Sequence, residues 1–312
     1  MWSTNHIVLN VDLGDTWEHM GIDSGNFAGC GGDCEAAISR HELDPTPGPE
    51  VVLKLTQSYN FCRYLVFVRA YSNPAVRVKW KLRGYIDHDF NRYQMSRHRT
   101  LSVNGRNFLV VRGQEGSGSG FSLYSETWYQ VDHNGVKPVL NYPVEGNTYP
   151  WPTGLGRKFK AKPLQAKHGA NSVSIRYAVT YTNLNYIKRD FSTLFVNNHR
   201  VHYTWSKRSR IFVFNSAQSD ITKAEIDAIA NIESESETES ATKIGNTTFY
   251  SPSESRSFVG GGYEVFLKYN SHRLMKIAIG KDAALKLWLQ EFLQECEDTT
   301  EKEALLQALQ KQ

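Results

Sequence analysis

Long apolar runs, cysteine-rich spacing patterns and recognisable motifs are what this 312-residue sequence has least of. No stretch approaches the roughly 20 apolar residues that a membrane helix requires, so we expect no membrane-spanning segment. Residues 1–6 contain neither a basic stretch nor a long apolar one, so no signal peptide is expected in the sequence as given. This leaves the localisation open.

Catalytic signatures are also absent. The chain contains no nucleophile elbow, no H-E-x-x-H helix and no dinucleotide fingerprint. An enzyme class therefore cannot be assigned from motifs. An enzyme is still not excluded, because catalytic groups often assemble from positions far apart in a sequence.

Cysteine is scarce, and its spacing is ambiguous. The four cysteines are Cys30, Cys34, Cys62 and Cys296, which allow three disulfide pairings. Cys30 and Cys34 have His19 and His41 nearby in the sequence, a residue set that suits zinc, but their spacing matches no known finger or ribbon. A disulfide and free thiols are the alternatives. We expect no metal site and no cofactor, and Cys296, at the end of a helical pattern, is expected to be a small core residue.

Charge is what the sequence has in an unusual arrangement. Residues 1–50 carry nine acidic residues and one basic residue, a formal charge of −8. Residues 51–219 carry 25 Lys and Arg against seven acids, a formal charge of +18, and residues 220–312 carry a formal charge of −6. Such asymmetry hints at binding to nucleic acid or another polyanion. Folding of the acidic ends onto the basic middle, or ordinary solvated charge, would explain it equally well.

The segment 76–83 alternates between apolar and basic residues without a break. Successive side chains of a β-strand point to opposite faces, so this pattern predicts a strand with a core face and a cationic face. The core face would consist of Val76, Val78, Trp80 and Leu82. The cationic face is the predicted anion-binding site and consists of Arg77, Lys79, Lys81 and Arg83.

Other segments also predict strands. They are 6–13, 51–56, 64–68, 107–112, 121–132, 136–142, 173–181, 201–205 and 211–214. Segment 64–68 is apolar on both faces, which is typical of a central, doubly covered strand. His133-Asn134-Gly135 predicts a hairpin turn, the Gly- and Ser-rich segment 113–120 predicts a flexible loop, and Glu35–Ser39 a short helix.

The pattern changes to a helical period after Ser216. Thr222 and Glu225 form a capping-box pattern, and Asp282 precedes an amphipathic segment from Leu285 to Cys296. Thr300 and Glu303 form a second capping-box pattern. We therefore predict an α+β fold with an antiparallel β-rich sheet or sandwich core, followed by a C-terminal helical portion. The predicted domains are a β-rich one at 1–219 and a helical region packed on it at 220–312.

Two classes of function follow. The first is a binding or interaction protein whose basic β-sheet face meets an anionic partner, either a polyanion or an acidic protein surface. The alternative is a hydrolase-type enzyme, for which the cluster Asp87, His88 and Asp89 is the best available site. His199 and His202 would point to opposite faces of one strand and so would not share a metal ion. The sequence gives no indication of the oligomeric state.

Overall fold

The computed structural model describes most of the chain between residues 34 and 311. The described ranges are 34–44, 49–57, 61–70, 79–89, 96–118, 121–148, 154–164, 171–185, 190–230, 241–244, 247–250 and 263–311. The predicted strand at 6–13 lies outside them. Within the described residues, no helix is long and apolar enough to cross a membrane.

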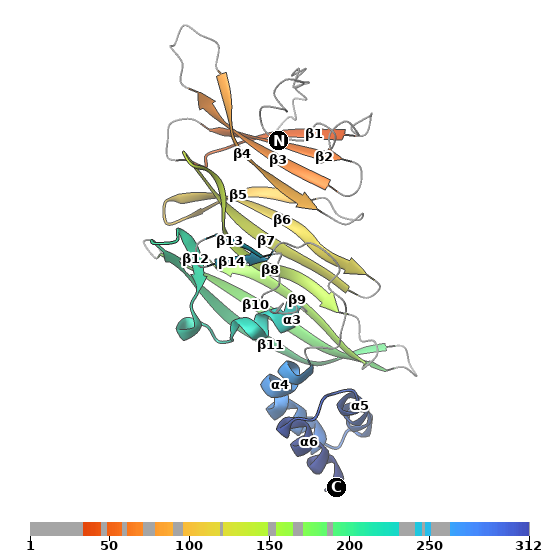
Figure 1. The fold of residues 1–312 in the computed structure, drawn as a ribbon. Coiled ribbons are helices and arrows are strands. Elements are labelled where there is room, and N and C mark those ends of the chain that lie inside the picture. The colour runs from red at the N-terminus through yellow and green to blue at the C-terminus, as the bar shows by residue number, and fades with distance from the viewer. Residues whose placement is uncertain are drawn as a thin grey trace.

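The first part of the chain forms a four-stranded antiparallel sheet, which we call sheet A (Figure 1). Its strands, in spatial order, are β1 (Cys34–His41), β2 (Glu50–Gln57), β3 (Phe61–Ala70) and β4 (Lys79–Asp89). In β3, Tyr64, Leu65 and Val66 are at most 1% exposed. This confirms the prediction of a strand covered on both faces, which its run of consecutive apolar residues requires.

The next eight strands form a second antiparallel sheet, sheet B, in which each strand pairs with the one before it. They are β5 (Arg97–Val103), β6 (Arg106–Gly118), β7 (Phe121–Asp132), β8 (Gly135–Thr148), β9 (Leu155–Leu164), β10 (Ser172–Asn185), β11 (Asp190–Ser206) and β12 (Ile211–Phe214). Sheet B curls strongly, so that its last strand approaches its second and third. The ring of Phe212 on β12 lies 5.7 Å from that of Phe108 on β6 and 5.8 Å from that of Trp128 on β7, measured between centroids.

The period-2 alternation of sheet B separates two hydrophobic cores. Phe108, Trp128 and Tyr177 belong to the larger, aromatic-rich core on the face that we call the inner face. Leu109 and Val111 point to the opposite, outer face, where they join Val52, Tyr64 and Ile86 of sheet A in the smaller core. Sheet A therefore packs on the outer face of sheet B at its β5–β8 end, as a sandwich.

Helices close the inner face of sheet B and extend the molecule at one end (Figure 1). They are the short 3₁₀ helix η1 (Ser216–Gln218), α3 (Lys223–Ala230), α4 (Tyr263–Ala278), α5 (Ala283–Gln294) and α6 (Thr300–Gln310). A small hairpin of β13 (Ala241–Ile244) and β14 (Thr247–Tyr250) lies between α3 and α4 in the chain. The predicted α+β class, β-rich with a helical C-terminal portion, is confirmed.

Two of the predicted helix caps are present. The Thr222 amide donates to Glu225 Oε2 at 2.7 Å and the Glu225 amide donates to Thr222 Oγ1 at 3.2 Å, a reciprocal capping box. The side chain of Asp282 accepts from the amides of Ala284 and Leu285 at the start of α5.

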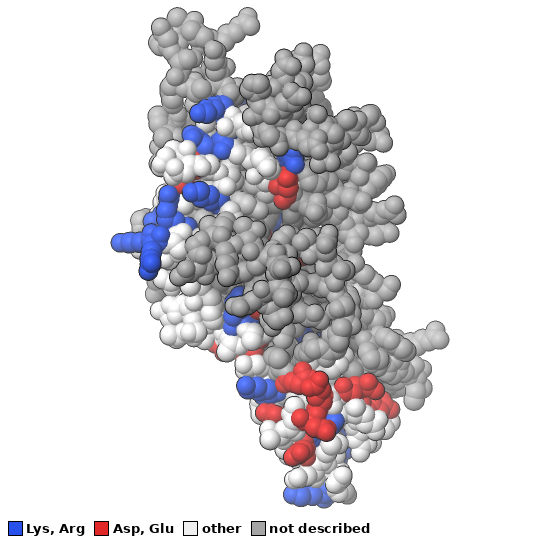
Figure 2. Space-filling model, in the orientation of Figure 1, with Lys and Arg blue, Asp and Glu red and all other residues white. Residues whose placement is uncertain are grey.

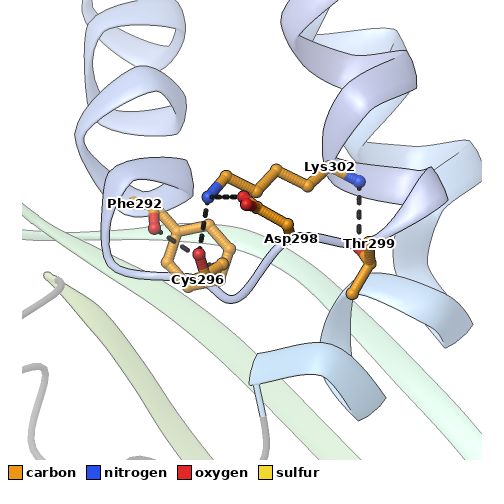
Figure 3. Close-up of polar contacts among 5 residues, drawn as sticks. All are labelled: Phe292, Cys296, Asp298, Thr299 and Lys302. Atoms are coloured by element: carbon orange, nitrogen blue, oxygen red, sulfur yellow. Dashed lines mark hydrogen bonds and ion pairs between the residues drawn. The ribbon is translucent and has the colours of Figure 1, made fainter.

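The third cap differs from the prediction by one residue. Thr299, not Thr300, caps α6, and its hydroxyl accepts from the Lys302 amide at 3.1 Å (Figure 3). The Lys302 ammonium group bends back to the Cys296 carbonyl, 2.6 Å away, and to Asp298, 2.9 Å away. These contacts close the turn from α5 to α6. Cys296 is a buried free thiol, which confirms its predicted core role.

Two local predictions are wrong. Glu35–Ser39 is not helical but lies in β1, because each of its residues pairs with β2. The Gly- and Ser-rich segment is not a loop up to residue 118, because β6 continues through Gly118 in register with β7, with a bulge between Gln114 and Gly116. In both cases pairing with a neighbouring strand outweighs local propensity.

Candidate functional site

The predicted cationic face lies partly in β4, the edge strand of sheet A. Arg77 lies outside the described residues, and Lys79 begins β4, although only its backbone is described. The side chain of Lys81 is exposed and that of Arg83 is half-buried. Lys81 therefore remains available to an anion.

A β-bulge interrupts the alternation at Arg83. Leu82 pairs with Phe67 and Gly84 pairs with Val66, which leaves Arg83 as an extra residue on β4. In an uninterrupted strand, Leu82 and Gly84 would point to the same face. Here they point to opposite faces, because their partners Phe67 and Val66 do. The alternation therefore changes sides at this point, and the predicted unbroken pattern ends at Arg83.

Arg83 joins the two sheets. Its Nη1 donates to the His133 carbonyl, 2.9 Å away, in the turn between β7 and β8. A Cβ atom at Gly84 would lie 3.0 Å from Val136 Cγ2, so glycine eases this close approach of β4 to β8, and a larger residue would require Val136 to move. Asn134-Gly135 forms the predicted hairpin turn there, with Gly135 at a φ of 127°. Arg83 is thus already engaged within the protein.

The Asp87 carboxylate is also engaged. Arg63 Nη2 donates to Asp87 Oδ2 at 2.8 Å, and Arg63 Nε donates to Asp87 Oδ1. The Arg63 guanidinium lies over the Tyr85 ring at 5.0 Å. The side chains of His88 and Asp89 are not among those described. Within the described part of the chain, no group of three or more His, Cys, Asp or Glu side chains is placed to hold a metal.

A second cationic row lies on the outer face of sheet B, away from sheet A. Lys162 on β9 pairs directly with Arg176 on β10, and Arg176 pairs directly with Arg200 on β11. All three side chains are exposed. We call these three residues the cationic ladder. They lie 14 and 24 positions apart in the sequence, so strand pairing alone brings them together.

Among the described residues, the side chains of the cationic ladder form no ion pair, although Asp220 Oδ2 accepts from the Arg200 backbone amide at 2.9 Å. None of the three side chains lies within 4 Å of an Asp or Glu oxygen in the part of the chain that the structure describes. Lys158 and Lys160 extend it along β9, and Lys160 is 3.4 Å from Glu145. In the view of Figure 2, Asp and Glu gather over the C-terminal helices, while Lys and Arg predominate over the strands above them.

A polar cluster occupies the contact between β1 of sheet A and β5 of sheet B. Ser39 Oγ is hydrogen-bonded to His98 Nε2 at 2.8 Å and to His41 Nε2 at 2.7 Å. His41 Nδ1 is hydrogen-bonded to Thr100 Oγ1 at 2.7 Å. Burial lowers the pKa of His41, and burial together with the charges of His41 and Lys54 lowers the pKa of His98 to about 4. Both rings are therefore neutral at pH 7.

His199 and His202 point to opposite faces of β11, as the sequence predicts. His199 pairs with the inward-pointing Tyr177, whereas His202 pairs with Ser174 on the outer face. His202 Nδ1 is hydrogen-bonded to Ser174 Oγ at 3.0 Å. The two rings therefore cannot bind one metal ion together.

Sequence patterns could not have identified the cationic ladder or the Ser39 cluster, because each depends on which strands pair or pack. The nearest signal was the density of Lys and Arg in residues 51–219.

Comparisons with protein-family models, with curated proteins and with solved structures found no match for this chain.

Proposed function

We propose that the protein binds a linear polyanion through the basic outer face of sheet B, with the cationic ladder Lys162, Arg176 and Arg200 at its centre. The observation that carries the proposal is the register of the ladder. Three exposed cations stand directly opposite one another on neighbouring strands, and among the described residues none of their side chains is ion-paired with a carboxylate.

Physical chemistry makes this arrangement costly in the absence of an anion. The Cβ atoms of directly opposite residues on antiparallel strands lie about 5 Å apart, and like charges there are destabilising. A row of phosphate or sulfate groups would neutralise them and release counterions. Ser174 and Ala178 flank Arg176 on the same face of β10, and both are small, so they leave the charged groups accessible.

Binding of a fluorescent heparin oligosaccharide tests the proposal. We expect Lys162→Gln/Arg176→Gln/Arg200→Gln to bind about tenfold or more weakly at low salt. The slope of log K against log salt concentration should also fall by about 2 to 3, since each contact contributes about 0.7 to 0.9. Inorganic polyphosphate as a second probe separates recognition of charge from recognition of the sugar.

A matched control removes the same charge elsewhere. Lys137→Gln/Lys207→Gln/Arg208→Gln also neutralises three exposed cations, but none of them belongs to the ladder. It should keep most of the affinity. Equal losses in both triple variants would show that net charge alone drives retention, and the proposal would then fail.

We also propose a second function, hydrolysis of an ester, because the Ser39 cluster has the geometry of an activated nucleophile. Ser39 Oγ lies 2.7 Å from His41 Nε2, and Thr100 orients the opposite nitrogen of the same ring. Ser39 Oγ would attack the ester carbonyl while its proton passes to His41. His41 would then protonate the departing alcohol, and water would release the acid.

Labelling with a fluorophosphonate probe, followed by peptide mass spectrometry, tests this function. We expect the label on Ser39 in the folded protein and none in Ser39→Ala. Ser102→Ala, which changes an exposed serine on β5, should leave labelling unchanged. Because burial lowers the pKa of His41, reactivity should persist below pH 6.5. A folded wild-type protein that resists the probe from pH 6 to pH 9 would exclude a nucleophilic Ser39.

A further inference from the structure

A small cavity of about 50 Å³, with both polar and apolar lining residues, lies between the inner face of sheet B and the helices α3 and α4. Strands β9, β10 and β11 contribute Arg157, Tyr181, Asn197 and His199 to its lining, and the helices contribute Glu225 and Asn270 among others. This cavity lies on the opposite face of the sheet from the cationic ladder, so its role is independent of polyanion binding.

Arg157 brings a positive charge to the cavity, and the one carboxylate of the lining, that of Glu225, is not ion-paired with it. Its Nη2 donates to Thr148 Oγ1 at 3.3 Å, while its buried Nε has no hydrogen-bond partner. Among the described residues, no carboxylate oxygen lies within 4 Å of the guanidinium. Burial lowers the pKa of Arg157, yet arginine keeps its charge in proteins. A buried cation with a free N–H group requires an acceptor, preferably an anionic one.

Asn197 supplies an unpaired acceptor in the same lining. Asn197 is only 9% exposed, and its Nδ2 donates to Asn270 Oδ1 at 2.9 Å. Asn270 is held in turn, because its Nδ2 donates to the Phe266 carbonyl at 2.9 Å. Rotating either amide by 180° would break these bonds, so the chain of contacts fixes both orientations. Asn197 Oδ1 is consequently left buried without a donor.

The other polar groups of the lining include a hydroxyl, an imidazole ring and one carboxylate, which is already engaged in a helix cap. Burial raises the pKa of Tyr181, so its hydroxyl stays protonated and can donate. Burial also raises the pKa of Glu225, whose carboxylate accepts from the Thr222 amide in the capping box. The His199 pKa is lowered by burial, so this ring is neutral at pH 7. None of these groups adds a second positive charge beside Arg157.

We propose that this cavity binds a small hydroxycarboxylate, whose carboxylate accepts from the Arg157 guanidinium and whose hydroxyl donates to Asn197 Oδ1. The volume suits such a molecule, because about 10 to 15 Å³ of this kind of space holds one water-sized group. About three to five such groups fit, and glycolate, a two-carbon acid, is at the upper end of this range. Glycolate satisfies both the free donor and the free acceptor, whereas acetate satisfies only the donor.

Thermal unfolding and isothermal titration with glycolate, acetate and ethylene glycol test the proposal at constant ionic strength and pH 7. We expect glycolate to raise the unfolding midpoint and to bind about tenfold more tightly than acetate, with no effect of ethylene glycol. Arg157→Gln should abolish glycolate binding. Lys207→Gln, an exposed change on the β11–β12 turn, should leave it unchanged.

Two outcomes would overturn the proposal. If glycolate shifts the midpoint no more than sodium chloride at the same ionic strength, the cavity holds only water. If Arg157→Gln still binds glycolate, the acid binds elsewhere. Should Arg157→Gln fail to fold, Asn197→Ala provides the second arm. It removes the acceptor, and the preference for glycolate over acetate should then disappear.

Discussion

The two faces of strands β9 to β11 carry opposite chemistry although the same strands build both. On the inner face, Ile175, Tyr177 and Val179 are fully buried under the curled sheet and the helices. On the outer face, one residue away along the same strands, Lys162, Arg176 and Arg200 are exposed and stand in register. The chain thus covers one face with its own side chains and leaves the other face charged and uncovered by sheet A.

The contrast indicates which residues stabilise the fold and which are available to a partner. Burial of apolar side chains is the main favourable term in folding, so the inner face stabilises the protein. Aligned like charges oppose folding, so the outer face does not. The predictions below test this difference, from the largest expected effect to the smallest.

The largest effect is expected from truncation on the inner face. Ile175→Ala should lower the free energy of unfolding by about 2 to 5 kcal/mol, because it leaves a cavity among fully buried neighbours. Its neighbour Arg176→Ala should not lower the free energy of unfolding and should raise it by about 1 kcal/mol at most, since the side chain is exposed and lies between two like charges. Urea unfolding of both variants measures the difference, and similar values would contradict the assignment of the two faces.

Overpacking of the inner core should have the next largest effect. A Cβ atom at Gly146 would lie 2.5 Å from Phe159 Cε1 and 2.9 Å from the Ser122 carbonyl oxygen. Gly146→Ala should therefore cost about 1 to 3 kcal/mol. Lys137→Ala, an exposed change on the same strand β8, is the control and should be close to neutral. An equally stable Gly146→Ala would show that the core around Phe159 has room to spare.

Acid should weaken the contact between sheet A and sheet B through the Ser39 cluster. The folded pKa of His98 is about 4, below its usual 6.5, so the unfolded chain binds its proton more readily. Stability is therefore fully present above pH 6.5 and falls as the pH drops from 6.5 towards 4. After allowance for solvent screening at a partly exposed ring, the loss is on the order of 1 to 2 kcal/mol.

Replacement of the ring isolates this contribution. His98→Gln keeps a polar group but cannot titrate, so its stability should depend less steeply on pH between 6.5 and 4. Chemical unfolding at several pH values gives both slopes. Parallel curves for the wild type and the variant would show that other groups cause the acid sensitivity.

The smallest effect is expected for the cationic ladder itself. Arg176→Ser removes the central charge and should raise the free energy of unfolding by about 0.2 to 1 kcal/mol at low salt, since it relieves repulsion from both neighbours. Added salt should reduce the difference in unfolding free energy between Arg176→Ser and the wild type, because exposed charges are screened. If Arg176→Ser is no more stable than the wild type at low salt, the charges of the ladder are already compensated within the protein.

Local patterns in the sequence predicted much of the fold. Two helix caps and one hairpin turn appear where the pattern places them, because caps and turns depend on a few neighbouring residues. They are the capping box of Thr222 and Glu225, the cap at Asp282 and the turn at Gly135. The errors arose where a distant strand decides the outcome. Residues 113–118 have low strand propensity, yet pairing with β7 holds them in β6.

The functional surfaces were much less predictable. The sequence could identify Lys81 and Arg83 as neighbours on one strand, but not the bulge that pairs Arg83 with the hairpin at His133. Lys162, Arg176 and Arg200 meet only because β9, β10 and β11 pair in one register. Register is set by the whole inner core, so no short motif encodes it.

The most direct measurement of the central claim is the thermal unfolding midpoint with and without inorganic polyphosphate, at constant ionic strength. The account predicts that polyphosphate raises the midpoint of the wild type and of Lys137→Gln/Lys207→Gln/Arg208→Gln. A ligand that binds only the folded state stabilises that state. The midpoint of Lys162→Gln/Arg176→Gln/Arg200→Gln should therefore stay unchanged, because this variant lacks the binding site. Equal shifts in all three proteins, or none in the wild type, would contradict the claim that this face of the sheet binds polyanions.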